Sequence, residues 1–209
     1  MPAPPPPPPP IIEKEAPHPE IAIQPPARVL YTETGWASWY GPHYNTRPAA
    51  NGEIYDMNSM TAAHLTIPLN SIARVTNIKT GDSAMVRITD RGPFVSNRVL
   101  DLSKAAAEKL NVYRPGTALV RIEVMESPVP IDSAGRWCVQ IGAFKSADEA
   151  AELRAKISRR YHTAHVLQFT SPIGEEWLRI RVAQDDKKRA QELIQETSTN
   201  AGVYLVRLD

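Results

Sequence analysis

The sequence predicts a mainly β domain followed by a smaller α+β domain. Residues 34–126 contain several short segments that alternate apolar and polar residues, with a single helical segment among them. Residues 136–209 instead alternate strand and helix patterns in the order βαββαβ. The chain has 209 residues, of which 42% are hydrophobic, and this is enough apolar material for two modest cores.

The N-terminal residues 1–33 are predicted to form a proline-rich linker without a core. Twelve of the 20 prolines fall within residues 2–26, including the unbroken run Pro4–Pro10. Such a segment is either an extended polyproline II spacer or an unstructured tail. Neither a charged start followed by an apolar stretch nor 18 consecutive apolar residues is visible, so we expect no secretory signal and no membrane span in this chain.

The first domain, residues 34–126, is predicted to be a small β-barrel. Its strand segments are GWASWYG (35–41), SIARVTNI (71–78), SAMVRITD (83–90) and LVRIEVM (119–125). The helical segment KAAAEKL follows Asp101 and Ser103, which we expect to supply its capping side chains. Several short strands closed by a final strand after a helix suit a barrel better than an open sheet.

The second domain, residues 136–209, follows a linker at residues 127–135 and is predicted to be ferredoxin-like. Its strands are WCVQIGAF (137–144), AHVLQFT (164–170), EWLRIRVA (176–183) and VYLVRL (203–208), and its helices are expected at residues 146–161 and 187–198. The helices of such a fold cover one face of the sheet. Alternation along 176–183 then places Trp177, Arg179 and Arg181 on the other face, with Gln140 beside them.

An outward tryptophan beside two arginines and a glutamine suits carbohydrate binding, because aromatic faces stack on sugar rings and polar groups bond hydroxyls. The alternative is a solvated sheet face with one stray aromatic side chain.

The charge balance disfavours a nucleic-acid partner. The chain has 24 Lys and Arg and 23 Asp and Glu, so it lacks the basic excess of a nucleic-acid binder. The histidines show no ligand spacing, so no metal or cofactor is expected, and Cys138 is expected to be a packed residue.

The segment VRITDRGPF (86–94) is the strongest candidate for chemistry. It places Asp90 and Arg91 at the end of a strand, and Gly92-Pro93 then forces a turn. Catalytic groups are commonly displayed at such strand ends. A structural ion pair between Asp90 and Arg91 is the alternative.

Two long segments resemble a known family. Residues 51–81 (NGEIYDMNSMTAAHLTIPLNSIARVTNIKTG) and 86–110 (VRITDRGPFVSNRVLDLSKAAAEKL) resemble the six-stranded double-psi β-barrel of the rare lipoprotein A (RlpA) family. WCVQIGAF and WLRIRVA in the second domain are similar to SPOR domains, which bind peptidoglycan. The resemblance implies an endolytic murein lytic transglycosylase that cuts peptide-stripped glycan strands and leaves 1,6-anhydro ends.

The resemblance also implies which residues act. The family's acidic residues fall on Glu53 and Asp90, and its histidine falls on His64; Asp101 matches an acid that related barrels use. Asp90 is the favoured general acid, its pKa raised by burial and by Glu53, but Asp101 stays an alternative. We expect Arg91 to turn away from Asp90, since a guanidinium beside it would lower its pKa. As alternatives, His64 is a packed imidazole, Glu53 a solvated turn residue and Asp101 a helix cap.

The implied partners are peptidoglycan glycan strands, in particular denuded strands at the division septum, and we expect a monomer in the cell envelope or periplasm. A lipid anchor in the outer membrane would require a precursor form, because no lipid-carrying cysteine stands at this N-terminus. The rival reading is an expansin-like or scaffolding protein that binds peptidoglycan without cleaving it. We expect Trp177→Ala or Arg179→Ala to weaken binding to denuded sacculi and to leave the cleavage of soluble glycans by the barrel intact.

Overall fold

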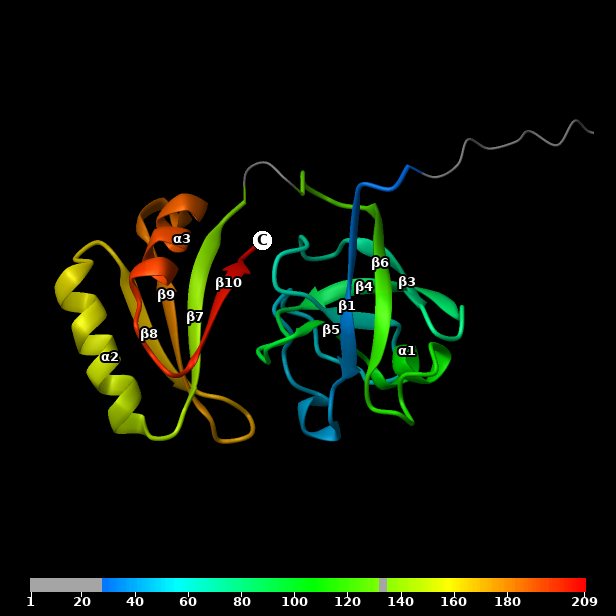
Figure 1. Cartoon of the computed structure of the whole chain (residues 1–209), viewed down its shortest axis with the longest axis horizontal. Helices are drawn as coiled ribbons and strands as arrows, with labels where there is room; N and C mark the ends of the chain where they lie inside the picture. The colour runs from blue at the N-terminus through cyan, green and yellow to red at the C-terminus, as the bar shows by residue number, and fades with distance from the viewer. Residues whose placement is uncertain (1–27, 132–134) are drawn as a thin grey trace, which may run out of the picture.

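The computed structural model describes residues 28–131 and 135–209, which form two domains lying side by side (Figure 1). Most of the predicted proline-rich linker lies outside the described residues. Within the described ranges, no helix combines the length and the apolar character needed to cross a membrane.

The first domain is a closed six-stranded barrel, which confirms the predicted fold. Its strands are β1 (Tyr31–Trp39), β2 (Thr61–Ala63), β3 (Ile72–Asn77), β4 (Ser83–Asp90), β5 (Arg98–Leu102) and β6 (Ala118–Glu126). They close in the order β1-β5-β2-β4-β3-β6, and the β1-β5 and β2-β4 pairs are parallel. Fully buried aliphatic side chains such as Val75, Ile88 and Ile122 fill the barrel. Closure leaves no free sheet edge.

Two of these strands, β2 and β5, are absent from the sequence-based prediction. All three residues of β2 are buried, so it is too short and too uniform for an alternating pattern to appear. The short helix α1 (Lys104–Lys109) is capped by Ser103, whose Oγ accepts a hydrogen bond from the Ala106 amide at 3.1 Å. Asp101 belongs to β5, so the prediction that it caps the helix is wrong.

The second domain has the predicted ferredoxin-like order. Its elements are β7 (Trp137–Phe144), α2 (Ala147–Arg160), β8 (His165–Thr170), β9 (Glu176–Arg181), α3 (Lys187–Glu196) and β10 (Gly202–Arg207). The sheet order is β10-β7-β9-β8. Both helices cover the same face, where Leu178 and Ile180 pack with Ile157 and Leu193 (Figure 1). The other face is therefore turned toward the barrel.

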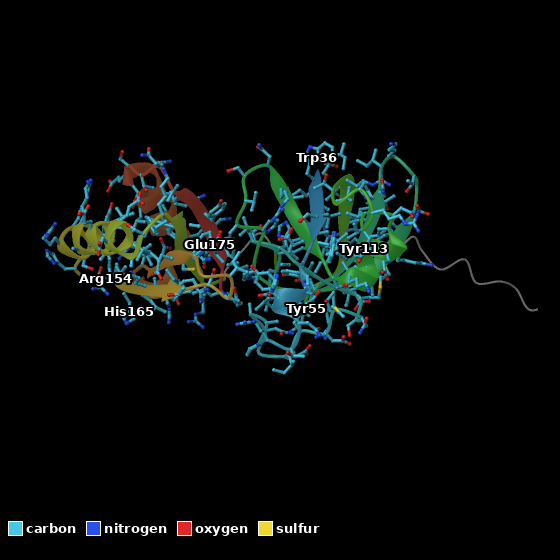
Figure 2. The ribbon with its side chains drawn as sticks, turned by 90° about the horizontal axis from the view of Figure 1, so that it is seen from below. Trp36, Tyr55, Tyr113, Arg154, His165 and Glu175 are labelled. Atoms are coloured by element: carbon cyan, nitrogen blue, oxygen red, sulfur yellow. The ribbon has the colours of Figure 1, made fainter. Side chains whose placement is uncertain are left out.

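The two domains touch through backbone and aromatic contacts. The Arg207 amide, at the end of β10, donates to the Leu65 carbonyl at 3.0 Å. The main-chain oxygen of Asp209 accepts from the Leu69 amide at 3.2 Å. Phe94 of the barrel packs against Trp177 of the second domain, with ring centroids 5.3 Å apart. The second domain is thus docked directly on the barrel, and the side-chain view in Figure 2 shows the same close approach near Glu175.

Docking corrects one prediction about the helix-free face. Trp177 and Gln140 lie on that face, but their exposed fractions are only 4% and 3% because the barrel and neighbouring side chains cover them. The expectation that they face solvent is wrong. The sequence pattern assigns a residue to a face of the sheet but carries no information about a second domain that packs there.

Candidate active site

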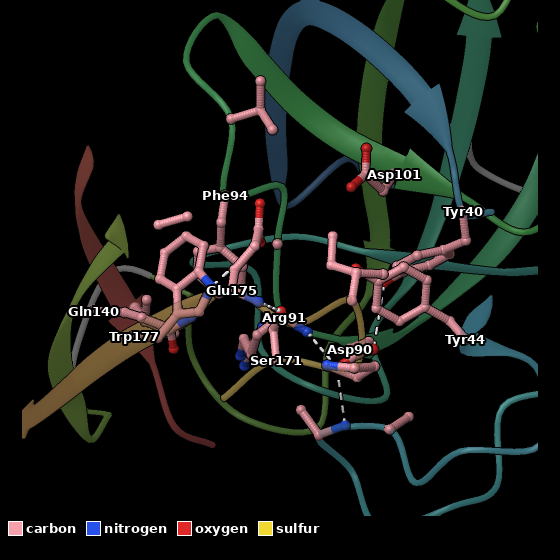
Figure 3. Close-up of a pocket in the computed structure, with 18 of the residues that line it drawn as sticks. Tyr40, Tyr44, Asp90, Arg91, Phe94, Asp101, Gln140, Ser171, Glu175 and Trp177 are labelled. Atoms are coloured by element: carbon pink, nitrogen blue, oxygen red, sulfur yellow. Dashed lines mark hydrogen bonds between the residues drawn. The ribbon is translucent and has the colours of Figure 1, made fainter. Parts of the chain in front are cut away.

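A cleft of about 650 Å³ lies between the two domains (Figure 3). The barrel contributes two acidic side chains, Asp90 and Asp101, together with Tyr40 and Tyr44. The second domain contributes polar and aromatic side chains from the helix-free face of its sheet and from the loop between β8 and β9. Few polar groups converging in a concave, partly apolar site are typical of a ligand-binding or catalytic pocket.

Asp90 ends β4, and its two carboxylate oxygens have different surroundings. Oδ1 accepts hydrogen bonds from the backbone amides of Arg91 at 2.8 Å and Ala50 at 3.0 Å. Oδ2 has only the Tyr40 hydroxyl, at 3.4 Å. Burial raises the pKa of Asp90, and the amides, the tyrosine and Arg91 offset part of that rise. Because Oδ1 is occupied by two donors, the proton of the neutral acid resides on Oδ2.

The Arg91 side chain points away from Asp90. One nitrogen, Nη1, donates to the carbonyls of His64 and Ile67 at 2.9 and 2.6 Å, and Nη2 donates to the main-chain oxygen of Asp209 at 2.7 Å. No ion pair joins Arg91 to Asp90 among the described residues. The guanidinium therefore serves structure and domain docking. Its turn away from Asp90 was expected from the sequence, and its contact with the second domain was not.

Asp101, which is buried, is the second aspartate that lines the cleft. Its Oδ1 accepts a hydrogen bond from the Ser38 hydroxyl at 2.6 Å, and its Oδ2 lies 3.5 Å from Nη2 of Arg98. Burial raises its pKa, and Ser38 and Arg98 counteract that rise. β5 pairs with β1 and β2, and the register Ser38↔Asp101 explains how these two side chains meet.

Tyr40 lies close to both acids and was not singled out by the sequence analysis. Burial, followed by the charges of Asp90 and Asp101, raises its pKa well above the ordinary value. Its ring packs at 5.1 Å from that of Tyr55 and at 5.7 Å from that of Tyr44. The available signal was its position near the end of the predicted aromatic strand segment 35–41.

Glu53 lies outside the cleft lining. Its carboxylate, with a side chain 54% exposed, forms a bidentate pair with Arg87 at 2.6 and 2.7 Å, and this pair lowers its pKa. The carboxylate of Glu53 is not among the groups that shift the pKa of Asp90, so burial raises that pKa without it. Glu53 nevertheless belongs to the loop that carries Ala50, whose amide contacts Asp90. Its geometry suits a positioning residue.

His64 is buried and fully hydrogen-bonded behind the cleft. Its Nδ1 accepts from the amides of Thr66 at 3.1 Å and Ile67 at 2.9 Å, so Nε2 carries the proton and donates to Glu33 at 2.9 Å. The ring does not line the cleft. It fixes the loop after β2, and the carbonyl of His64 accepts from Arg91.

The predicted sugar-binding residues of the second domain separate into two groups. Gln140, Trp177 and Arg179 line the cleft. Arg179 donates to Oε1 of Gln140 at 3.2 Å, and its guanidinium lies over the Phe169 ring. Arg181 is bound to Asp185 by two hydrogen bonds at 2.6 and 2.9 Å and does not line the cleft.

The half-buried Asp90, whose Oδ2 contacts only the Tyr40 hydroxyl, and the buried Asp101 define an acid–base site on a double-psi β-barrel. A family model described as lytic transglycolase matches residues 32–122, and a SPOR domain model matches residues 133–208. The chain thus carries a lytic transglycolase-type barrel followed by a SPOR domain.

Relatives agree with this assignment. The chain is 56% identical over 122 residues to an endolytic peptidoglycan transglycosylase RlpA of Neisseria meningitidis, covering 57% of this chain and 51% of the relative. It is 54% identical over 145 residues to the RlpA of Vibrio cholerae, covering 69% and 52%. The chain thus spans about half the length of these relatives. Among solved structures, Streptomyces papain inhibitor aligns with 47% of this chain and 97% of its own, with a TM-score of 0.38 and 20% identity.

Proposed function

We propose that this protein is an endolytic peptidoglycan lytic transglycosylase with Asp90 as its general acid. It cleaves the bond between N-acetylmuramic acid and N-acetylglucosamine in glycan strands, preferentially those without stem peptides, and leaves 1,6-anhydromuramic ends. The observation that carries the proposal is the state of Asp90: it is half-buried in the cleft, its pKa is raised, and the neighbouring guanidinium is turned away. The names of the relatives and the matched family model support the same reaction.

The reaction needs a proton on the leaving oxygen while positive charge develops at the anomeric carbon. Asp90 donates the proton from Oδ2 to the glycosidic oxygen, and the bond to the anomeric carbon breaks. The C6 hydroxyl of the same muramic acid then bonds to that carbon, and its proton passes to the Asp90 carboxylate. Water is not consumed, and the acid returns to its starting form.

Asp101 and Tyr40 have supporting roles in this scheme. An ionised Asp101 stabilises the positive charge at the sugar ring, because a carboxylate in a partly dry cleft interacts strongly with a developing cation. Tyr40 stays protonated at every physiological pH and holds Oδ2 of Asp90 in place. Glu53 acts indirectly, through the loop whose Ala50 amide binds Oδ1.

The SPOR domain supports a target in the cell envelope. We infer that it binds peptidoglycan there and directs the barrel to denuded strands at the septum. The domain type and the relatives' names support the envelope location, and the septal target is part of the proposal.

Product analysis tests the proposal. Purified protein is incubated with peptide-free glycan strands, and the products are analysed by mass spectrometry. The expected products are fragments with anhydromuramic ends, 18 Da lighter than their hydrolysed equivalents, and Asp90→Asn should form none. Strands that bind but remain uncut would instead support the expansin-like alternative, and reducing ends without anhydro groups would indicate hydrolysis.

A further inference from the structure

We propose that the SPOR domain forms one wall of the active-site cleft, so that a single peptide-free glycan strand contacts Asp90 and Arg179 at the same time. Arg179 binds the free lactyl carboxylate of a muramic acid in that strand. The proposal rests on the proposed function for its substrate class. It goes further in making the SPOR domain part of substrate binding at the cleavage site.

The first observation is the way the second domain is docked. The end of β10 forms backbone hydrogen bonds with the loop that follows β2, through Leu65 and Leu69. Arg91, the residue next to the proposed acid, donates to the main-chain oxygen of Asp209 at 2.7 Å. Phe94 packs against Trp177 and Tyr204, with centroids 5.3 and 5.5 Å apart. These contacts start at the catalytic segment itself, so docking fixes the second domain relative to Asp90.

The second observation is that the cleft is continuous across the domain boundary. The same cavity is lined by Asp90 and Asp101 on one side and by Gln140, Phe169 and Arg179 on the other. Figure 3 shows Asp90 with the labelled residues Gln140, Glu175 and Trp177 around the same pocket. A cleft of about 650 Å³ is large enough for more than one sugar ring.

The third observation is that, among the cleft arginines of the described residues, Arg179 is the one whose hydrogen bonds reach neither a carboxylate nor a main-chain oxygen. Arg91 and Arg207 donate hydrogen bonds to main-chain oxygens, and Arg207 also donates to the Asp209 carboxylate. Arg98 donates to the Asp101 carboxylate. Arg179 contacts the neutral Gln140 alone by hydrogen bond and has no carboxylate partner among the described residues. A half-buried guanidinium held by an amide oxygen and an aromatic ring is preorganised for a carboxylate.

Ligand chemistry accounts for a preference for denuded strands. A muramic acid without its stem peptide exposes a lactyl carboxylate, whereas the peptide converts that carboxylate to a neutral amide. A guanidinium distinguishes the two because its bond to a carboxylate is charge-assisted and bidentate.

A binding cycle tests the contact on the full chain made inactive by Asp90→Asn. The probe is a short soluble peptide-free glycan, either with free lactyl carboxylates or with the same groups capped as methylamides. Capping should weaken binding by about tenfold, and this difference should disappear when Arg179→Ala is added. Arg154→Ala, an exposed arginine on α2, is the matched control and should retain the tenfold difference (Figure 2). Equal sensitivity to capping in the Arg179 and Arg154 variants would overturn the proposal.

Kinetics then test whether the bound strand is the one that is cut. In the otherwise unchanged chain, Arg179→Ala should raise KM for the short soluble glycan about tenfold with little change in kcat. The KM of Arg179→Lys should lie between those of the unchanged chain and of Arg179→Ala. If the SPOR domain binds a separate strand, cleavage of the short glycan will be unaffected, and the proposal fails. If the unmodified chain releases no anhydro ends, the proposed function fails, while the binding cycle still reports on Arg179. Unchanged circular dichroism confirms that each variant is folded.

Discussion

The Arg91 guanidinium turns away from the adjacent Asp90 carboxylate and binds three main-chain oxygens instead, at 2.6 to 2.9 Å. Only the Arg91 backbone amide reaches Asp90, at 2.8 Å. This arrangement leaves the acid with a raised pKa while its neighbour fastens the second domain to the barrel. One dipeptide thus links the proposed chemistry to domain docking.

Removing the Arg91 side chain should destabilise the protein. Arg91→Ala leaves three main-chain oxygens without their charged donor, so we expect the free energy of unfolding to fall by about 2 kcal/mol or more. Urea denaturation measures the loss. Arg114→Ala, which removes an exposed arginine of the barrel, serves as the control and should change stability by less than about 0.5 kcal/mol. A loss as small as that of the control would mean that the three contacts contribute little.

The pH dependence of cleavage should follow the protonation of Asp90. Burial raises its pKa, so the acid stays protonated to a higher pH than an ordinary aspartate. We therefore expect kcat/KM to be high below this pKa and to fall as pH rises through it. Tyr40→Phe removes a hydrogen bond that favours the charged form, which should move the fall to higher pH. Tyr113→Phe, beside Trp39, is the control, and an identical shift there would exclude the Tyr40 contact as the cause.

Glu53→Gln and Asp90→Asn should differ in severity. Asp90→Asn removes the proton donor and should lower kcat by about 100-fold or more. Glu53→Gln breaks an exposed pair with Arg87 and acts through the Ala50 loop, so we expect a loss of about tenfold or less. Steady-state kinetics on peptide-free glycan measure both. A loss in Glu53→Gln equal to that in Asp90→Asn would place Glu53 at the reacting bond during turnover.

The domain contact depends on a glycine. A Cβ at Gly142 would lie 2.5 Å from the Trp177 ring, so Gly142→Ala must displace the tryptophan that packs against Phe94. Overpacking of this kind costs about 1–3 kcal/mol. We expect a lower melting temperature and a higher KM for glycan, since Trp177 lines the cleft. Gly81→Ala, where a Cβ meets nothing within 4 Å, controls for the general effect of replacing a loop glycine with positive φ.

Much of the fold could be predicted because it follows from local patterns. Alternation in SIARVTNI and SAMVRITD predicts β3 and β4, and the helical segment expected at residues 146–161 matches α2, whose cap Ser146 accepts a hydrogen bond from the Glu149 amide at 3.2 Å. β2 was not predicted because its three residues are all buried and show no alternation of apolar and polar side chains. Its pairing with β4 and β5 depends on closure of the barrel.

The candidate site divides in the same way. Local geometry alone predicts that Asp90 ends a strand before a turn and that Gln140, Trp177 and Arg179 share one sheet face. Contacts between distant segments place Asp101 and Tyr40 in the same cleft as Asp90, pair Glu53 with Arg87, and make His64 a packed imidazole.

The domain arrangement also depends on tertiary contacts, since the C-terminal end of the chain meets the barrel through residues more than 100 positions apart in the sequence. Burial and the direction of each side chain arise from contacts between distant segments, and a local pattern does not encode them.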